Sequence, residues 1–173
     1  MVDIMEEQRM EKVKSVTLDG EEIHVFNSAI YLFETNTTVT LELNIIVSEI
    51  VANKYKHVDK LIIEIELEDG RMINSIMNVT VMQGRLPQLH IFCDIDDLDE
   101  YKGLSILNEN NSSFPDIEEG ITLEEIRKVE MPLEDITLKL KLPIDQVEWL
   151  RTLKKKEVTA MMEEFLIYYR KKG

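Results

Sequence analysis

Residues 136–142 alternate between apolar side chains and side chains that can donate hydrogen bonds. The donor positions are Thr137, Lys139 and Lys141. The apolar positions are Ile136, Leu138, Leu140 and Leu142. Because successive side chains of a β-strand point to opposite faces, a strand here would place one hydroxyl and two ammonium groups together on one face. The pattern therefore predicts a strand with a candidate binding surface made of Thr137, Lys139 and Lys141.

The segment after this strand is predicted to be helical. Pro143 stops the strand and suits the first turn of a helix. An apolar stripe at three- and four-residue spacing follows, made of Val158, Met161, Met162, Phe165 and Tyr169. Two arrangements fit the segment. The segment forms either one continuous helix from 144 to about 171 or two shorter helices.

Other chemistry is weakly indicated. The acidic run 94–100 lacks the central glycine and distant glutamate of an EF-hand loop, so a solvated turn is favoured over a calcium site. The three histidines, His24, His57 and His90, are far apart in sequence and do not have zinc-site spacing. No nucleophile elbow, Cys–His pattern or phosphate loop is present. We therefore expect a non-enzyme with no metal and no cofactor.

Charge is distributed unevenly along the chain. The 173 residues carry a net charge of −14. Residues 136–173 contain nine Lys and Arg against five Asp and Glu, which is +4, so residues 1–135 carry −18. This asymmetry indicates either two different surfaces or an ordinary solvated helix with mixed charges. The single Cys93 excludes an internal disulfide, and no stretch has the length of a membrane span or the pattern of a signal peptide. These features predict a cytoplasmic protein.

The elements that must position these residues predict an α+β fold. Asp19-Gly20 and Asp69-Gly70 are tight-turn signals between strand-like runs. We expect a frayed N-terminus over 1–11, then an antiparallel β barrel or sandwich over 12–107. An acidic loop and a short helix, capped by Thr122 with Glu125, would occupy 108–133. The C-terminal part, 134–173, would contain the strand and one long or two short helices.

The C-terminal stretch 136–172 resembles a ribbon-helix-helix (Arc-type) DNA-binding module. The matching elements are the strand 136–142, the Leu142-Pro143 pair, a first helix over 144–155, Thr159 as cap, and a second helix over 160–171. The resemblance implies an interlocked homodimer whose two strands pair into a ribbon that enters the major groove. It also implies that Thr137, Lys139 and Lys141 face base edges, where lysine donates to guanine O6 and N7. Thr159 and the following amides would lie near a phosphate.

Two hypotheses of different classes follow. The first is a non-enzymatic DNA-binding regulator whose acidic β domain senses a ligand or partner, or limits non-specific DNA binding by repulsion. The second is an acidic protein-interaction or inhibitor module that binds a basic protein, including one normally bound to DNA, with the C-terminal helix serving only for packing.

Overall fold

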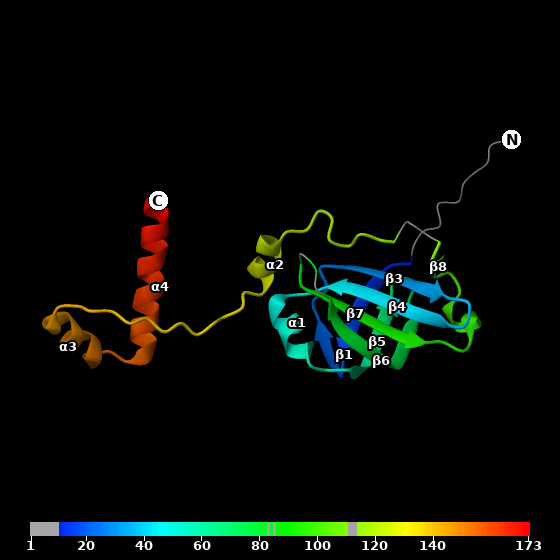
Figure 1. The fold of residues 1–173 in the computed structure, drawn as a ribbon, viewed down its shortest axis with the longest axis horizontal. Coiled ribbons are helices and arrows are strands. Elements are labelled where there is room, and N and C mark those ends of the chain that lie inside the picture. Colours follow the sequence, from blue (N-terminus) through cyan, green and yellow to red (C-terminus); the bar gives the residue numbers. More distant parts are fainter. Residues whose placement is uncertain (1–10, 83, 85, 111–113) are drawn as a thin grey trace. The chain divides into compact units, whose positions relative to one another are not determined.

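The chain divides into two compact units, Met1–Leu133 and Glu134–Gly173. Their folds are drawn in Figure 1. The computed structural model describes residues 11–82, 84, 86–110 and 114–173. The predicted frayed N-terminus therefore lies outside the described residues, except for its last residue. Within the described residues, no helix has the length and apolar character needed to cross a membrane.

The first unit is built on one eight-stranded sheet with the order β2-β1-β5-β6-β7-β4-β3-β8. All neighbouring strands are antiparallel except β3 and β8, which are parallel. The strands are β1 Val13–Leu18, β2 Glu21–Ile23, β3 Asn27–Glu34, β4 Val39–Ile46, β5 Lys60–Leu67, β6 Met72–Met82, β7 Gln88–Asp94 and β8 Ile106–Asn108.

Both glycine turns occur where the sequence predicts them. Asp19 (φ 47°) and Gly20 (φ 84°) form the turn between β1 and β2, and Gly70 (φ 92°) lies in the turn between β5 and β6. Residues without a bulky side chain, or with a short polar one, tolerate this positive φ best. Asp19 is held further by its carboxylate, which accepts a 2.8 Å hydrogen bond from the Ile62 backbone amide. Local turn chemistry therefore sets these two hairpins.

The sheet curves around a single main core but does not close. Residues of β1, β3, β4, β5, β6 and β7 contribute to one buried cluster, in which Leu43, Ile63 and Leu89 have no exposed surface. The two end strands, β2 and β8, are three residues long and do not pair with each other. The predicted α+β class is confirmed. The predicted antiparallel barrel or sandwich is confirmed only in part, because the strands form one open sheet whose three-residue end strands, β2 and β8, do not pair to close it.

A second buried cluster lies on the other face of β3 and β4, under the segment that follows β8. It contains Ile117 and Ile126, which are 4% and 0% exposed. Figure 1 shows this segment running back along the sheet to α2 (Leu123–Val129), near α1 (Glu49–Tyr55). The described part of the predicted acidic loop is therefore anchored by buried isoleucines. A one-turn 3-10 helix, η1 (Leu98–Tyr101), lies between β7 and β8.

The second unit consists of an extended segment, α3 (Ile144–Thr152) and α4 (Lys155–Lys172). The predicted strand 136–142 forms no strand ladder within the chain, so this prediction is wrong for the isolated chain. A β-strand needs a hydrogen-bonded neighbour, and the described sheet does not include this segment. Of the two helical arrangements, two helices are present, because Leu153 and Lys154 both have extended backbone (ψ 146° and 155°).

Candidate nucleic-acid interface

The extended segment carries three of the four residues predicted to bind DNA. Thr137, Lys139 and Lys141 are all exposed, and they stand at alternate positions of one short stretch. The apolar residues between them are exposed too: Ile136 is 80% and Leu140 is 65% exposed. A row of exposed apolar side chains is unusual on the surface of a monomeric domain and is typical of an interaction surface. The segment therefore carries alternating donor and apolar side chains, all of them exposed.

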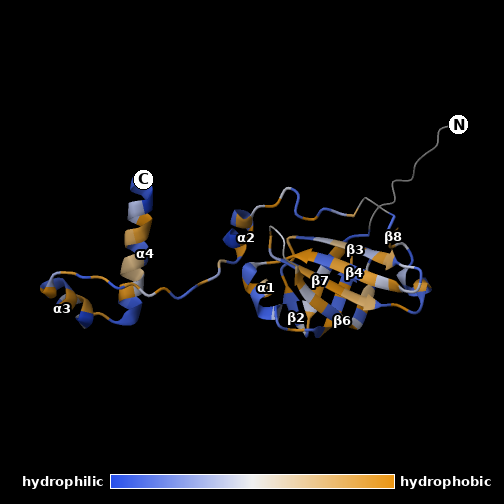
Figure 2. Cartoon of the chain, in the orientation of Figure 1, coloured by the Kyte–Doolittle hydropathy of each residue, from blue (hydrophilic) through white to orange (hydrophobic). Residues whose placement is uncertain are grey.

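The two helices bury no residue of their own. Figure 2 shows apolar positions on α3, on α4 and on the extended segment. We call Val158, Met161, Met162, Phe165 and Tyr169 the α4 stripe. Within it, the rings of Phe165 and Tyr169 lie 4.5 Å apart between centroids. Trp149 on α3 remains 55% exposed. This unit therefore has a large exposed apolar surface and no buried core of its own.

The fourth predicted residue, Thr159, is not a helix cap. It lies inside α4, and its hydroxyl donates a 3.0 Å hydrogen bond to the Lys155 carbonyl one turn earlier. The N-cap is Lys154, whose backbone amide donates a 2.7 Å hydrogen bond to the Glu157 carboxylate. Threonine is by itself a more favourable N-cap residue than lysine, so residue type alone indicates the wrong position. The glutamate three residues after Lys154 is the sequence signal that marks the true start.

The start of α4 gathers three cations that the sequence prediction did not assign to the site. Lys154, Lys155 and Lys156 are exposed at the N-terminal end of this 18-residue helix. The N-terminus of a helix carries partial positive charge, so cations there are unfavourable for the helix and favourable for a bound anion. Only Glu157 offsets them within the first turn. The helix start is therefore a second cationic feature of this unit, beside the extended segment.

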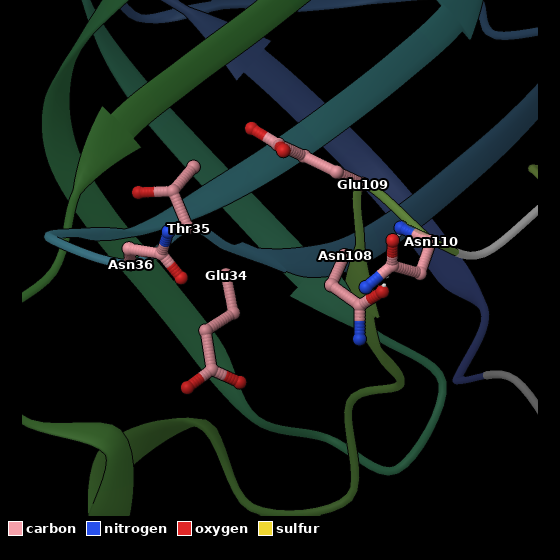
Figure 3. Close-up of a pocket in the computed structure, with 6 residues that line it drawn as sticks. All are labelled: Glu34, Thr35, Asn36, Asn108, Glu109 and Asn110. Atoms are coloured by element: carbon pink, nitrogen blue, oxygen red, sulfur yellow. Dashed lines mark hydrogen bonds between the residues drawn. The ribbon is translucent and has the colours of Figure 1, made fainter.

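The first unit has a polar cavity of about 380 Å³ where the β3–β4 turn meets the end of β8. It is lined by Glu34, Thr35, Asn36, Asn108, Glu109 and Asn110. Figure 3 shows the carboxylates of Glu34 and Glu109 pointing in different directions rather than toward a shared point. Among the described residues, no three His, Cys, Asp or Glu side chains converge as a metal site would require. The cavity therefore shows polar side chains at one end of the sheet and, in the part of the chain that is described, no arrangement of metal ligands.

The residues weighed for metal binding have structural partners. Asp97, in the acidic run, accepts a 2.9 Å hydrogen bond from the Asp99 amide and caps η1. His90 pairs with Glu42 on the outer face of the sheet and stacks on Phe92 at 5.0 Å between ring centroids. His24 packs edge-on against the ring of Phe26, 4.5 Å between centroids. These contacts give the residues roles in the fold.

Comparisons with protein-family models, with curated proteins and with solved structures found no match to this chain.

Proposed function

We propose that this chain is a non-enzymatic DNA-binding regulator that acts as a homodimer through its C-terminal unit, residues 134–173. The observation that carries the proposal is the exposed segment 136–142, in which donors and apolar residues alternate, followed by two helices that bury none of their apolar residues. The acidic β unit would serve for sensing or for partner binding.

A second copy is the simplest partner for the extended segment. Suppose that the segments of two copies pair antiparallel with Lys139 opposite Lys139. Odd-numbered residues then lie opposite odd-numbered residues, so Thr137 of one copy faces Lys141 of the other. All donors of both copies then lie on one face of the ribbon, and all apolar residues lie on the other. The apolar face would be covered by α3 and α4 of both copies. Pairing of this kind satisfies the backbone and buries the uncovered leucines at once.

The ligand of such a ribbon would be a polyanion. Self-pairing places Lys139 opposite Lys139 of the second copy, and like charges directly opposite each other in a ribbon are destabilising. The lysines at the start of α4 are likewise in an unfavourable place for their own helix. Both costs are relieved by phosphate groups, and a two-stranded ribbon fits the major groove, where lysine donates to guanine O6 and N7. These arguments support DNA as the ligand.

A specific observation favours the second candidate function, an acidic module that binds a basic protein. Residues 1–135 carry −18 against +4 for the rest, and an acidic surface repels phosphate. In this alternative the C-terminal unit packs on its partner and never meets DNA. The two candidates differ in one measurable respect, which is affinity for DNA at low salt.

The test uses the full-length protein and fluorescence anisotropy with a mixed-sequence DNA duplex over a salt series. The proposal expects binding that weakens steeply with salt, with a slope of about 0.9 for each phosphate contacted. Lys139→Ala/Lys141→Ala should lower the affinity and reduce that slope. The matched control is Lys56→Ala/Lys60→Ala, which removes two exposed lysines of the β unit.

Two results of this binding test would reject the proposal. One is undetectable binding by the intact protein at low salt. The other is equal loss of affinity in the control and in the ribbon variant, which would mean that only net charge matters. A strict monomer by light scattering would also reject it, because a ribbon requires one strand from each of two chains.

A further inference from the structure

Helix α4 carries an apolar residue on the face opposite the α4 stripe. Ile167 follows Val158 by nine residues, which is about two and a half helical turns, so the two side chains point in opposite directions. Ile167 is 58% exposed. In the proposed dimer the stripe faces the partner, and a helix buries one stripe against its core. Ile167 would therefore stay on the outside after the dimer forms.

The charges around Ile167 are ordered along the helix. Glu163 and Glu164 lie one turn before it, and Arg170 and Lys171 lie one turn after it. Residues three or four positions apart are neighbours on a helix surface. The residue at that spacing from each of these four charged side chains is Ile167, so none of the four has an opposite charge of this group as its neighbour within the helix. Within the described part of the chain, none of these four side chains makes an ion pair. The outer face thus has an acidic end, an apolar centre and a basic end.

This order is self-complementary for an antiparallel contact. Consider a two-fold axis that lies between two copies of α4, perpendicular to both helices and level with Ile167. This axis brings Ile167 against Ile167 of the second copy. It places Glu163 opposite Arg170 and Glu164 opposite Lys171, in both directions. A parallel contact would instead oppose acid to acid and base to base. The charge pattern therefore selects both the occupant and its direction.

We propose that the outer face of α4, formed by Glu163, Glu164, Ile167, Arg170 and Lys171, is a second self-association surface that joins one dimer to the next. The proposal rests on the proposed function in one respect, since it assumes that the α4 stripe is used within the dimer. The contact of one helix with another is small compared with a stable interface, and exposed ion pairs are weak. Assembly is therefore concentration-dependent, and neighbouring dimers on one DNA molecule would bind cooperatively because the DNA holds them close together.

The first test measures molar mass by light scattering over a wide concentration range, with the full-length protein and no DNA. We expect the mass to rise above that of a dimer. Ile167→Glu should raise the concentration for half-assembly by roughly tenfold to a hundredfold, in line with the burial of one isoleucine. The matched control is Ile76→Glu, which changes an isoleucine that is 65% exposed on the β unit and should leave the assembly unchanged. A wild-type mass that stays at the dimer or the monomer overturns the proposal.

A charge-reversal cycle tests the direction of the contact. Glu163→Lys/Glu164→Lys should weaken assembly beyond the dimer, and so should Arg170→Glu/Lys171→Glu. The fourfold variant, which carries all these changes, should restore it, because every pair is again opposite in sign. Failure of the fourfold variant to restore assembly overturns the antiparallel pairing even if each pair of changes alone is disruptive.

DNA binding separates this inference from the function on which it rests. Ile167→Glu should keep the affinity for a duplex that holds one dimer and lose cooperativity on a duplex that holds two. If the wild type assembles as described but binds no DNA, the function fails and the self-association surface stands. If it binds DNA as independent dimers and never assembles, the surface fails and the function stands.

Discussion

The two units of this chain differ in how they treat apolar side chains. In the β unit, Ile63 and Leu89 have no exposed surface, and even the segment after β8 buries Ile117 and Ile126. In the C-terminal unit, neither helix has a buried residue, and Leu138 and Leu140 stand exposed at 55% and 65%. The first unit buries most of its apolar side chains within itself, whereas the second leaves its apolar side chains exposed. The difference shows which unit has apolar side chains left to bury, and the proposed homodimer would bury them.

The largest expected effect comes from breaking the core of the β unit. Ile63→Ala should lower its free energy of unfolding by about 2–5 kcal/mol, because a fully buried side chain leaves a cavity. The neighbouring Ile62 is 57% exposed on the same strand, so Ile62→Ala should cost less than about 1 kcal/mol. Urea unfolding followed by far-ultraviolet circular dichroism measures both. Equal effects would mean that the β unit lacks the buried core described here.

The next prediction concerns the partner of the C-terminal unit. Leu140→Glu should convert the dimer to a monomer by light scattering, because it places a charge on the apolar face of the proposed ribbon. The unfolding midpoint of the β unit should stay unchanged, since Leu140 belongs to the other unit. Leu133→Glu is the matched control, with a leucine that is 93% exposed and outside the segment. A dimer that survives Leu140→Glu would place the interface elsewhere.

A smaller effect distinguishes the true start of α4 from the predicted one. Glu157→Ala should destabilise the C-terminal unit by roughly 0.5–1 kcal/mol, because it removes the acceptor of the Lys154 amide and the only acidic charge of the first turn. Thr159→Ala should change it by less than about 0.5 kcal/mol. Trp149 is the only tryptophan and lies on α3, so its fluorescence reports on this unit alone. A larger loss for Thr159→Ala would restore Thr159 as the cap.

The smallest expected effect is a pH dependence of the contact between α1 and α2. The hydrogen bond from the Arg127 guanidinium, 2.6 Å from Nε to Oε1, lowers the pKa of the Glu49 carboxyl. A lowered pKa in the folded state stabilises above the ordinary carboxyl pKa, and the contribution is lost as the pH falls through the lowered value. Arg127→Gln should therefore cost less than about 1 kcal/mol at neutral pH and nothing in strong acid. Urea midpoints of both proteins across this range provide the measurement, and a cost that persists in acid would show that packing, not charge, is lost.

Local signals in the sequence determined several elements of this protein. The aspartate–glycine pairs at 19–20 and 69–70 indicate turns by their backbone preferences. The capping box of α2 is present as predicted: Thr122 Oγ1 accepts the Glu125 amide at 3.2 Å, and Glu125 accepts the Thr122 amide at 3.1 Å. Pro143 precedes α3, where its fixed φ suits a helix start. These features depend on residues a few positions apart, so the sequence contains all the information they need.

Only the tertiary structure decided the features that depend on distant residues. The order of strands, the parallel pairing of β8 with β3 and the open edges of the sheet follow from which apolar faces pack together, not from any local pattern. The helix break at Leu153 and Lys154 differs from these, because it lacks a glycine or proline and only the local Glu157 cap signal indicates it. The segment 136–142 also shows that a local pattern is not sufficient to form a strand. Its alternation specifies which face is apolar, but a strand also requires a hydrogen-bonded neighbour, and the described sheet provides none for it.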